Sequence, residues 1–146
     1  MINKKWIGYK LRPSVLPIER TRLQFFAKAI GETNPIYTDV AAAHDAGYAD
    51  LPAPLTFLFA AELDSGASDK LLADLQIPLA KLLHGEQSFI YHRPACVGDT
   101  ITVQSEITDI YDKKNGALEF VVKKSRATNQ RNELVAEINL TLVCRH

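Results

Sequence analysis

The hydrophobic pattern of the chain changes at Pro78, and this change constrains the fold more than any other feature of the sequence. Before it, segment 54–65 is apolar on nearly every side, which is typical of a helix buried in the interior. After it, segments 101–107 and 134–144 alternate apolar with polar residues, as half-buried strands do. A buried helix followed by strands predicts an α+β domain in which an antiparallel sheet packs on that helix.

Weaker signals of the same kind predict further elements on both sides of Pro78. Asp39 is a suitable N-cap for a short alanine-rich helix. Polar turns at 114–116 and 129–133 separate successive strands, and such short connections indicate an antiparallel meander. The predicted helices are 18–30, 39–46, 54–65 and 68–75, and the predicted strands are 87–92, 101–107, 120–126 and 134–144.

Length, charge and cysteine content exclude several classes of protein. The 146 residues fit one domain spanning 1–146, and 17 Lys and Arg residues balance 17 Asp and Glu residues. The chain therefore lacks the basic excess of general nucleic-acid or membrane-surface binding proteins. Its longest apolar run, 51–61, is shorter than the about 20 residues of a membrane span. Two cysteines favour a cytoplasmic protein, and no HxH, HExxH or CxxC spacing indicates a metal site.

Three separated motifs carry the functional signal. The first is Gly31-Glu32-Thr33-Asn34-Pro35-Ile36-Tyr37 at the end of a predicted helix, and the second is Gly47-Tyr48. The third, Ala53-Pro54-Leu55-Thr56-Phe57, opens the buried helix. In this order, and with Tyr91-His92-Arg93-Pro94 further on, the chain resembles the MaoC-like (R)-specific enoyl-thioester hydratases and (R)-3-hydroxyacyl-thioester dehydratases.

That resemblance implies a hot-dog fold, in which an antiparallel sheet wraps around a long central helix. It also implies an acyl-thioester substrate, carried by CoA or by an acyl carrier protein, and no metal or dissociable cofactor. In the family, a paired Asp and His exchange protons with water and with the carbon next to the thioester carbonyl. The substrate-binding residues that the resemblance assigns are Asn34, Tyr48, Ala53, Pro54, Leu55, Thr56, Phe57 and Gly85.

The chain departs from the family motif at both catalytic positions, where Glu32 replaces the Asp and Tyr37 replaces the His. A phenol titrates near ~10 and an imidazole near ~6.5, so Tyr37 is a poor base at neutral pH. The same departure is found in non-catalytic subunits of heterodimeric (R)-3-hydroxyacyl dehydratases and in the N-terminal half of two-domain MaoC-like hydratases. The resemblance therefore implies a homodimer, or a heterodimer with a homologous catalytic hot-dog subunit.

Several alternatives stay open at this point. His84 is either a structural residue that fixes a loop or a replacement acid–base group. Lys123, Lys124 and Arg126 are expected on a charged outer strand face, although contact with the phosphates of a carrier is also considered. The rival functions are a hot-dog acyl-CoA thioesterase and a purely structural acyl-binding subunit. Acyl chain length, carrier and pathway are not given by the residues.

Overall fold

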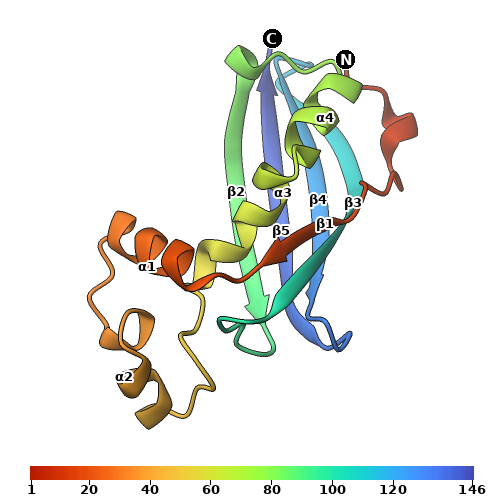
Figure 1. Ribbon diagram of the computed structural model, residues 1–146. Coiled ribbons are helices and arrows are strands. Elements are labelled where there is room, and N and C mark those ends of the chain that lie inside the picture. The colour runs from red at the N-terminus through yellow and green to blue at the C-terminus, as the bar shows by residue number, and fades with distance from the viewer.

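A five-stranded antiparallel sheet curls around a helical segment in the computed structural model, which describes all residues from 1 to 146 (Figure 1). The strand order is β1-β3-β4-β5-β2. The strands are β1 (Ser14–Pro17), β2 (Leu82–Tyr91), β3 (Thr100–Lys113), β4 (Leu118–Thr128) and β5 (Leu134–Arg145). The α+β expectation, with the sheet packed on a buried helix, is confirmed.

The central helical segment is divided rather than continuous. It begins as a 3-10 helix, η3 (Leu55–Phe59), continues directly into α3 (Ala60–Asp64), and restarts as α4 (Ala67–Asp74). Between α3 and α4 lies Gly66, whose φ of 70° is left-handed. Glycine adopts that conformation without the steric cost that a side chain brings, so the helix is interrupted there.

The remaining helices are short and lie at one end of the molecule or in connections. Helices α1 (Arg20–Ala29) and α2 (Val40–Asp45) stand beside the lower end of the sheet in Figure 1. Single 3-10 turns occur at η1 (Lys4–Trp6), η2 (Pro35–Tyr37) and η4 (Leu79–Lys81). The longest helix has ten residues, and none meets the length and apolarity that a bilayer crossing requires.

The sheet differs from the predicted meander at both of its edges. Strands β3, β4 and β5 do follow one another, and Lys114, Asn115 and Gly116 all have positive φ in the first of the tight turns. Strand β2, however, pairs with β5 rather than β3. The place beside β3 is taken by β1, which the analysis of the sequence missed because four residues are too few to show alternation. The meander prediction is therefore wrong for β2.

Two hydrophobic clusters fill the space between the sheet and the central segment. One packs Phe57 of η3 against the sheet near Val103, and the other packs Leu71 of α4 near Ile107. Four buried polar side chains lie between the clusters: Glu62 of α3, Ser105 of β3, and Lys123 and Ser125 of β4. We refer to these four residues as the polar layer.

The position of Lys123 contradicts the expectation of a charged outer face. Its side chain is only 2% exposed, whereas Lys124 and Arg126 are exposed as expected. The reason is the alternation of β4, in which residues 121, 123, 125 and 127 all face inward. Lys123 therefore occupies a core position between Val121 and Ser125.

Candidate functional site

A cavity of about 290 Å³ lies at the N-terminal end of η3. Residues from η2, the segment leading into η3, the end of β2 and the start of β5 form its walls, and eight of the thirteen are hydrophobic. An apolar cavity with a few polar groups is typical of a small-molecule site. The lining residues are Tyr37, Tyr48, Pro52, Ala53, Pro54, Leu55, Leu58, Tyr91, His92, Arg93, Pro94, Ala95 and Val135.

Backbone hydrogen bonds hold the two walls of this cavity together. The N–H of Ala53 donates to the carbonyl of Ala95 at 2.7 Å, and the N–H of Val97 donates to the carbonyl of Leu51 at 3.0 Å. Pro54 is the N-cap residue of η3, where its fixed φ and missing N–H are tolerated because the N–H groups at a helix start have no partner within the helix. The start of the central segment is thus anchored to the loop that follows β2.

Three tyrosines supply much of the polar surface of the cavity. The hydroxyl of Tyr91 donates to the carbonyl of Leu55 at 2.6 Å. Burial raises the pKa of Tyr37, and the nearby Glu32 carboxylate and Tyr48 act in the same direction. Burial also raises the pKa of Tyr91, with a further contribution from Tyr37. With their pKa raised, Tyr37 and Tyr91 serve as hydrogen-bonding groups rather than bases near pH 7.

Glu32 lies beside Tyr37 but outside the cavity lining. Its Oε1 atom accepts hydrogen bonds from the backbone N–H groups of Thr33 and Asn34, both at 2.9 Å. Asn34 in turn caps η2, with its Oδ1 accepting from the N–H of Ile36 at 3.2 Å. In this arrangement the Glu32 carboxylate, at the position where the family motif has Asp, stabilises the turn that follows it.

Five of the predicted site residues come together in the cavity, namely Tyr37, Tyr48, Ala53, Pro54 and Leu55. The others lie elsewhere. Phe57 is 1% exposed in the core, where its ring meets Phe26 at 5.2 Å between centroids. Thr56 is exposed and, like Asn34, falls outside the lining.

His84 and Gly85 are on β2, away from this cavity. The His84 imidazole is exposed and packs edge-on against Phe59, with ring centroids 5.6 Å apart. Gly85 sits where the β2–β5 register shifts, and a Cβ there would lie 2.6 Å from Cγ2 of Val143. Close packing against β5 is therefore enough to explain a glycine at this position.

Residue-level reasoning on the sequence did not assign Tyr91, Leu58 or Val135 to the site. Tyr91 is the last residue of β2. The only sequence feature that could have assigned it to the site was its position just before His92-Arg93-Pro94. His92 lines the cavity, but its Nε2 lies 2.9 Å from Oε2 of Glu137. Because its neighbours at 136 and 138 face inward, Glu137 faces outward and holds the imidazole toward the outer side of the sheet. No group of three or more His, Cys, Asp or Glu side chains gathers as a metal site would require.

Comparison with known proteins identifies the family to which this chain belongs. Residues 5–138 match the family model described as "FAS1-like, dehydratase domain region". This chain belongs to that family. A UPF0336 protein of Parafrankia sp. (strain EAN1pec) is 36% identical over 148 residues, which cover 99% of this chain and 95% of that protein.

Solved structures of dehydratases share the fold. The C-terminally truncated HadBC (3R-hydroxyacyl-ACP dehydratase) complex of Mycobacterium tuberculosis aligns with a TM-score of 0.79 at 27% identity, covering 94% of this chain and 96% of that chain. A structure described as a MaoC-like dehydratase aligns with a TM-score of 0.83 at 24% identity, over 96% of this chain and 42% of that one. The hot-dog fold and the resemblance to MaoC-like proteins are confirmed.

Proposed function

We propose that this chain is the acyl-thioester-binding domain of an (R)-specific 2-enoyl-thioester hydratase or 3-hydroxyacyl dehydratase. A homologous hot-dog subunit supplies the Asp and His that this chain lacks. In the hydration direction, water adds its hydroxyl to C3 of the enoyl group and a proton is delivered to C2. The reverse reaction removes the same water, so no oxidant, reductant or cofactor is consumed.

One observation carries the proposal: the cavity at the start of η3 has apolar walls and tyrosine hydroxyls but no carboxylate in its lining. Such walls suit an acyl chain, and phenol hydroxyls suit the thioester carbonyl. General acid–base chemistry needs a group that exchanges protons near the operating pH. The raised pKa of Tyr37 removes it from that role, and the His92 imidazole is held toward the outer side of the sheet by Glu137. Binding without a competent acid–base pair is therefore the function that fits these residues best.

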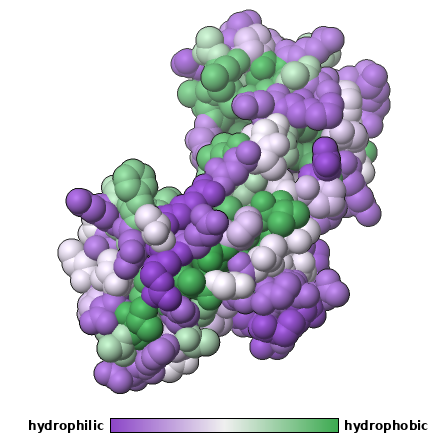
Figure 2. Space-filling view, viewed as in Figure 1, coloured by the Kyte–Doolittle hydropathy of each residue, from purple (hydrophilic) through white to green (hydrophobic).

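The free edge of the sheet supports a partnered state. Strand β2 has ten residues and only one neighbour, β5, and exposed Leu83, Ile90 and Tyr91 lie along it. A long edge with exposed apolar side chains is a template for pairing with another chain. Figure 2 shows further apolar surface where the α1–α2 end joins the rest of the molecule. The HadBC relative, a complex by its description, is consistent with a second hot-dog subunit at such a surface.

Arg93 gives the cavity mouth a positive charge suited to a carrier. Its side chain is exposed, and its Nη1 is 3.8 Å from Oε1 of Glu133, a loose contact for an ion pair. Both CoA and acyl carrier protein present a phosphopantetheine arm, so the guanidinium suits either one. Replacing Arg93 by Ala is expected to weaken binding of both, and a loss confined to CoA would assign the contact to its nucleotide portion.

The decisive experiment measures loss of the enoyl chromophore of crotonyl-CoA and of crotonyl-carrier protein. The purified chain alone is expected to be weak or inactive, whereas the complex with a homologous subunit carrying Asp-x-Asn-Pro-x-His is expected to be active. Glu32→Asp combined with Tyr37→His is expected to raise the activity of the chain by about 10²–10⁴-fold. Family-like rates from the unmodified chain would contradict the proposal.

The same assay distinguishes the rival functions. Release of free thiol, without hydration, would identify a thioesterase. Acyl-thioester binding without turnover, even in the presence of the partner, would identify a structural acyl-binding subunit. The matched control is Glu106→Asp combined with Tyr111→His, which makes the same two substitutions outside the cavity lining.

A further inference from the structure

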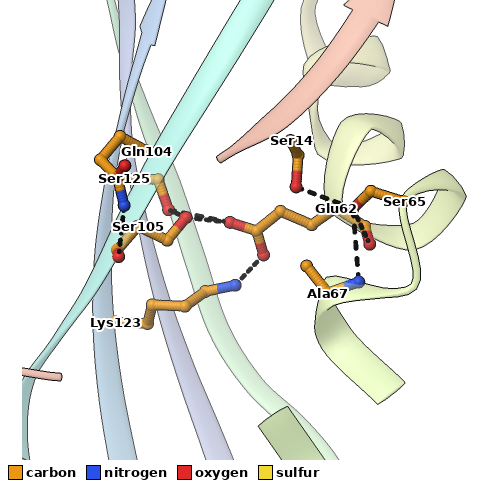
Figure 3. Close-up of polar contacts among 8 residues, drawn as sticks. All are labelled: Ser14, Glu62, Ser65, Ala67, Gln104, Ser105, Lys123 and Ser125. Atoms are coloured by element: carbon orange, nitrogen blue, oxygen red, sulfur yellow. Dashed lines mark hydrogen bonds and ion pairs between the residues drawn. The ribbon is translucent and has the colours of Figure 1, made fainter. Parts of the chain in front are cut away.

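The polar layer is a fully bonded group of side chains in the middle of the core. In Figure 3, Glu62 reaches from α3 toward Ser105 on β3 and Lys123 on β4. One carboxylate oxygen accepts from the hydroxyls of Ser105 and Ser125, and the other pairs with Nζ of Lys123. The hydroxyl oxygens of the two serines lie 2.8 Å apart. Each charge is therefore compensated within the layer.

The layer lies in line with the acyl-binding cavity. Leu58 lines that cavity and also a second, much smaller space of about 10 Å³, and so forms a wall between them. Glu62, Lys123 and Gln87 belong to the lining of the small space. A volume of this size accommodates about one water molecule. From Leu55 at the large cavity to the layer, the rise of the helical segment is roughly 12 Å.

The small space presents polar atoms to anything that enters past Leu58. The Nε2 of Gln87 is buried and has no hydrogen-bond partner. Behind it, burial lowers the pKa of the Lys123 ammonium to about 8, and its Nζ pairs with the Glu62 carboxylate. A hydrocarbon chain offers no hydrogen bond to these groups, and moving them aside would leave buried charges unpaired.

We propose that the polar layer is the closed inner end of the acyl channel, so that the site accepts short-chain acyl thioesters and rejects long ones. This inference rests on the proposed function, because it assigns the acyl group to the cavity at η3. Glu62 and Lys123 then determine specificity without touching the reacting atoms. Leu58 sets where the apolar part of the channel ends, and the layer prevents its extension along the sheet toward Leu140.

The test measures the affinity of S-butyl, S-hexyl, S-octyl and S-dodecyl coenzyme A for the full chain by isothermal titration calorimetry. Burial of each methylene is expected to tighten binding about fourfold. For the wild-type chain this gain is expected to stop, or reverse, between the hexyl and dodecyl ligands. A gain that continues through the dodecyl ligand would overturn the inference and leave the proposed function intact.

Two variants locate the stop. Glu62→Leu combined with Lys123→Met removes both charges together, and is expected to move the break to a longer chain. The control is Glu106→Leu combined with Lys124→Met. These two residues lie directly opposite each other on the outer face of β3 and β4, and their replacement is expected to leave the break at the same chain length. Leu58→Ala keeps the layer, and is expected to move the break only slightly because the layer still closes the channel.

The outcomes separate this inference from the proposed function. An unchanged break in the folded double variant would show that the layer is structural only and would overturn the inference. If the double variant does not fold, the wild-type series and Leu58→Ala still test the inference. If Leu58→Ala alone abolishes the chain-length limit, Leu58 sets that limit and the inference about the layer is wrong. No binding of any of the four ligands, including S-butyl coenzyme A, would overturn both proposals.

Discussion

The cavity and the polar layer occupy the two ends of the same η3–α3 segment, and they use polar groups in opposite ways. At the cavity the polar groups are three tyrosine hydroxyls, His92 and the exposed Arg93 at the mouth, without a carboxylate among them. In the layer, the charged side chains of Glu62 and Lys123 are at least 94% buried. They pair with each other, and Glu62 also accepts a hydrogen bond from Ser105. Buried charge is thus confined to the layer, whereas the one guanidinium of the cavity lining, that of Arg93, is exposed at the mouth.

The contrast teaches how a binding site and a structural stop differ physically. A site that must accept and release a ligand uses groups whose exposure costs little. A stop must resist displacement, and buried charges resist it because separating them is costly. Four changes test this difference, two in the layer and two near the cavity.

The largest effect is expected from breaking the ion pair on one side only. Glu62→Leu or Lys123→Met alone is expected to lower the free energy of unfolding by about 3–5 kcal/mol, because the remaining charge is buried without a partner. The double variant is expected to be close to the wild type, or more stable. Chemical denaturation of the three variants measures this. If the double variant lost the sum of the two single losses in free energy of unfolding, Glu62 and Lys123 would not be coupled and the prediction would be wrong.

The pH dependence of stability is the next largest effect. Burial lowers the pKa of Lys123 from 10.5 to about 8. The folded state therefore binds fewer protons than the unfolded state between these values, so the cost of burying the ammonium is complete below pH 8 and is relieved as pH rises toward 10.5. Relative to the double variant, the wild type is expected to gain stability over this window, and the gain is limited because a neutral Lys123 no longer balances the buried Glu62 carboxylate. Parallel pH profiles of the two proteins would contradict it.

A smaller effect is expected at the cavity from Tyr91→Phe. This change removes the hydroxyl that donates to the carbonyl of Leu55 while keeping the ring, which stacks on Phe89. A loss of about 0.5–1.5 kcal/mol in the free energy of unfolding is expected, as for an ordinary hydrogen bond. Thermal denaturation measures it, with Tyr111→Phe, which has no hydroxyl hydrogen bond, as the control. A loss as large as that of the layer would remove the distinction between the two regions.

The smallest effect is expected from Glu32→Gln. The amide oxygen of Gln can still accept from the N–H groups of Thr33 and Asn34, and the side chain lies outside the cavity. The free energy of unfolding is expected to change by less than about 0.5 kcal/mol, and hydration by the partnered enzyme to be unaffected. A large drop in hydration rate would mean that the Glu32 carboxylate does reach the substrate.

Elements with a regular period were predictable from the sequence, and those set by distant contacts were not. The positive φ values of Lys114, Asn115 and Gly116 follow from a recognisable turn sequence. Strand β1 is too short for a period to show, and it is defined by its register with β3. The pairing of β2 with β5 is likewise a tertiary choice that no local pattern of residues 87–92 encodes.

The candidate site was predictable where a motif carried it. Tyr48, Ala53, Pro54 and Leu55 were assigned by resemblance and do line the cavity. The polar layer was missed because Lys123 stands next to Lys124, and two adjacent lysines indicate a solvated face. Strand parity was the available signal, since Lys123 shares its face with Val121.

The separation of the core into two hydrophobic clusters has a consequence for local unfolding. The polar layer lies between the cluster around Phe57, which includes residues of α1 and α2, and the cluster around Leu71 of α4, and of the helical elements η3 packs against both through Phe57 and Phe59. Parts of a protein that share few apolar contacts open with different free energies. Backbone amides of α1 and η3 are thus expected to exchange with solvent deuterium as one group, and those of α4 and the adjoining ends of β4 and β5 as another. The entrance of the cavity is then expected to open and reclose while the far half of the sheet stays folded.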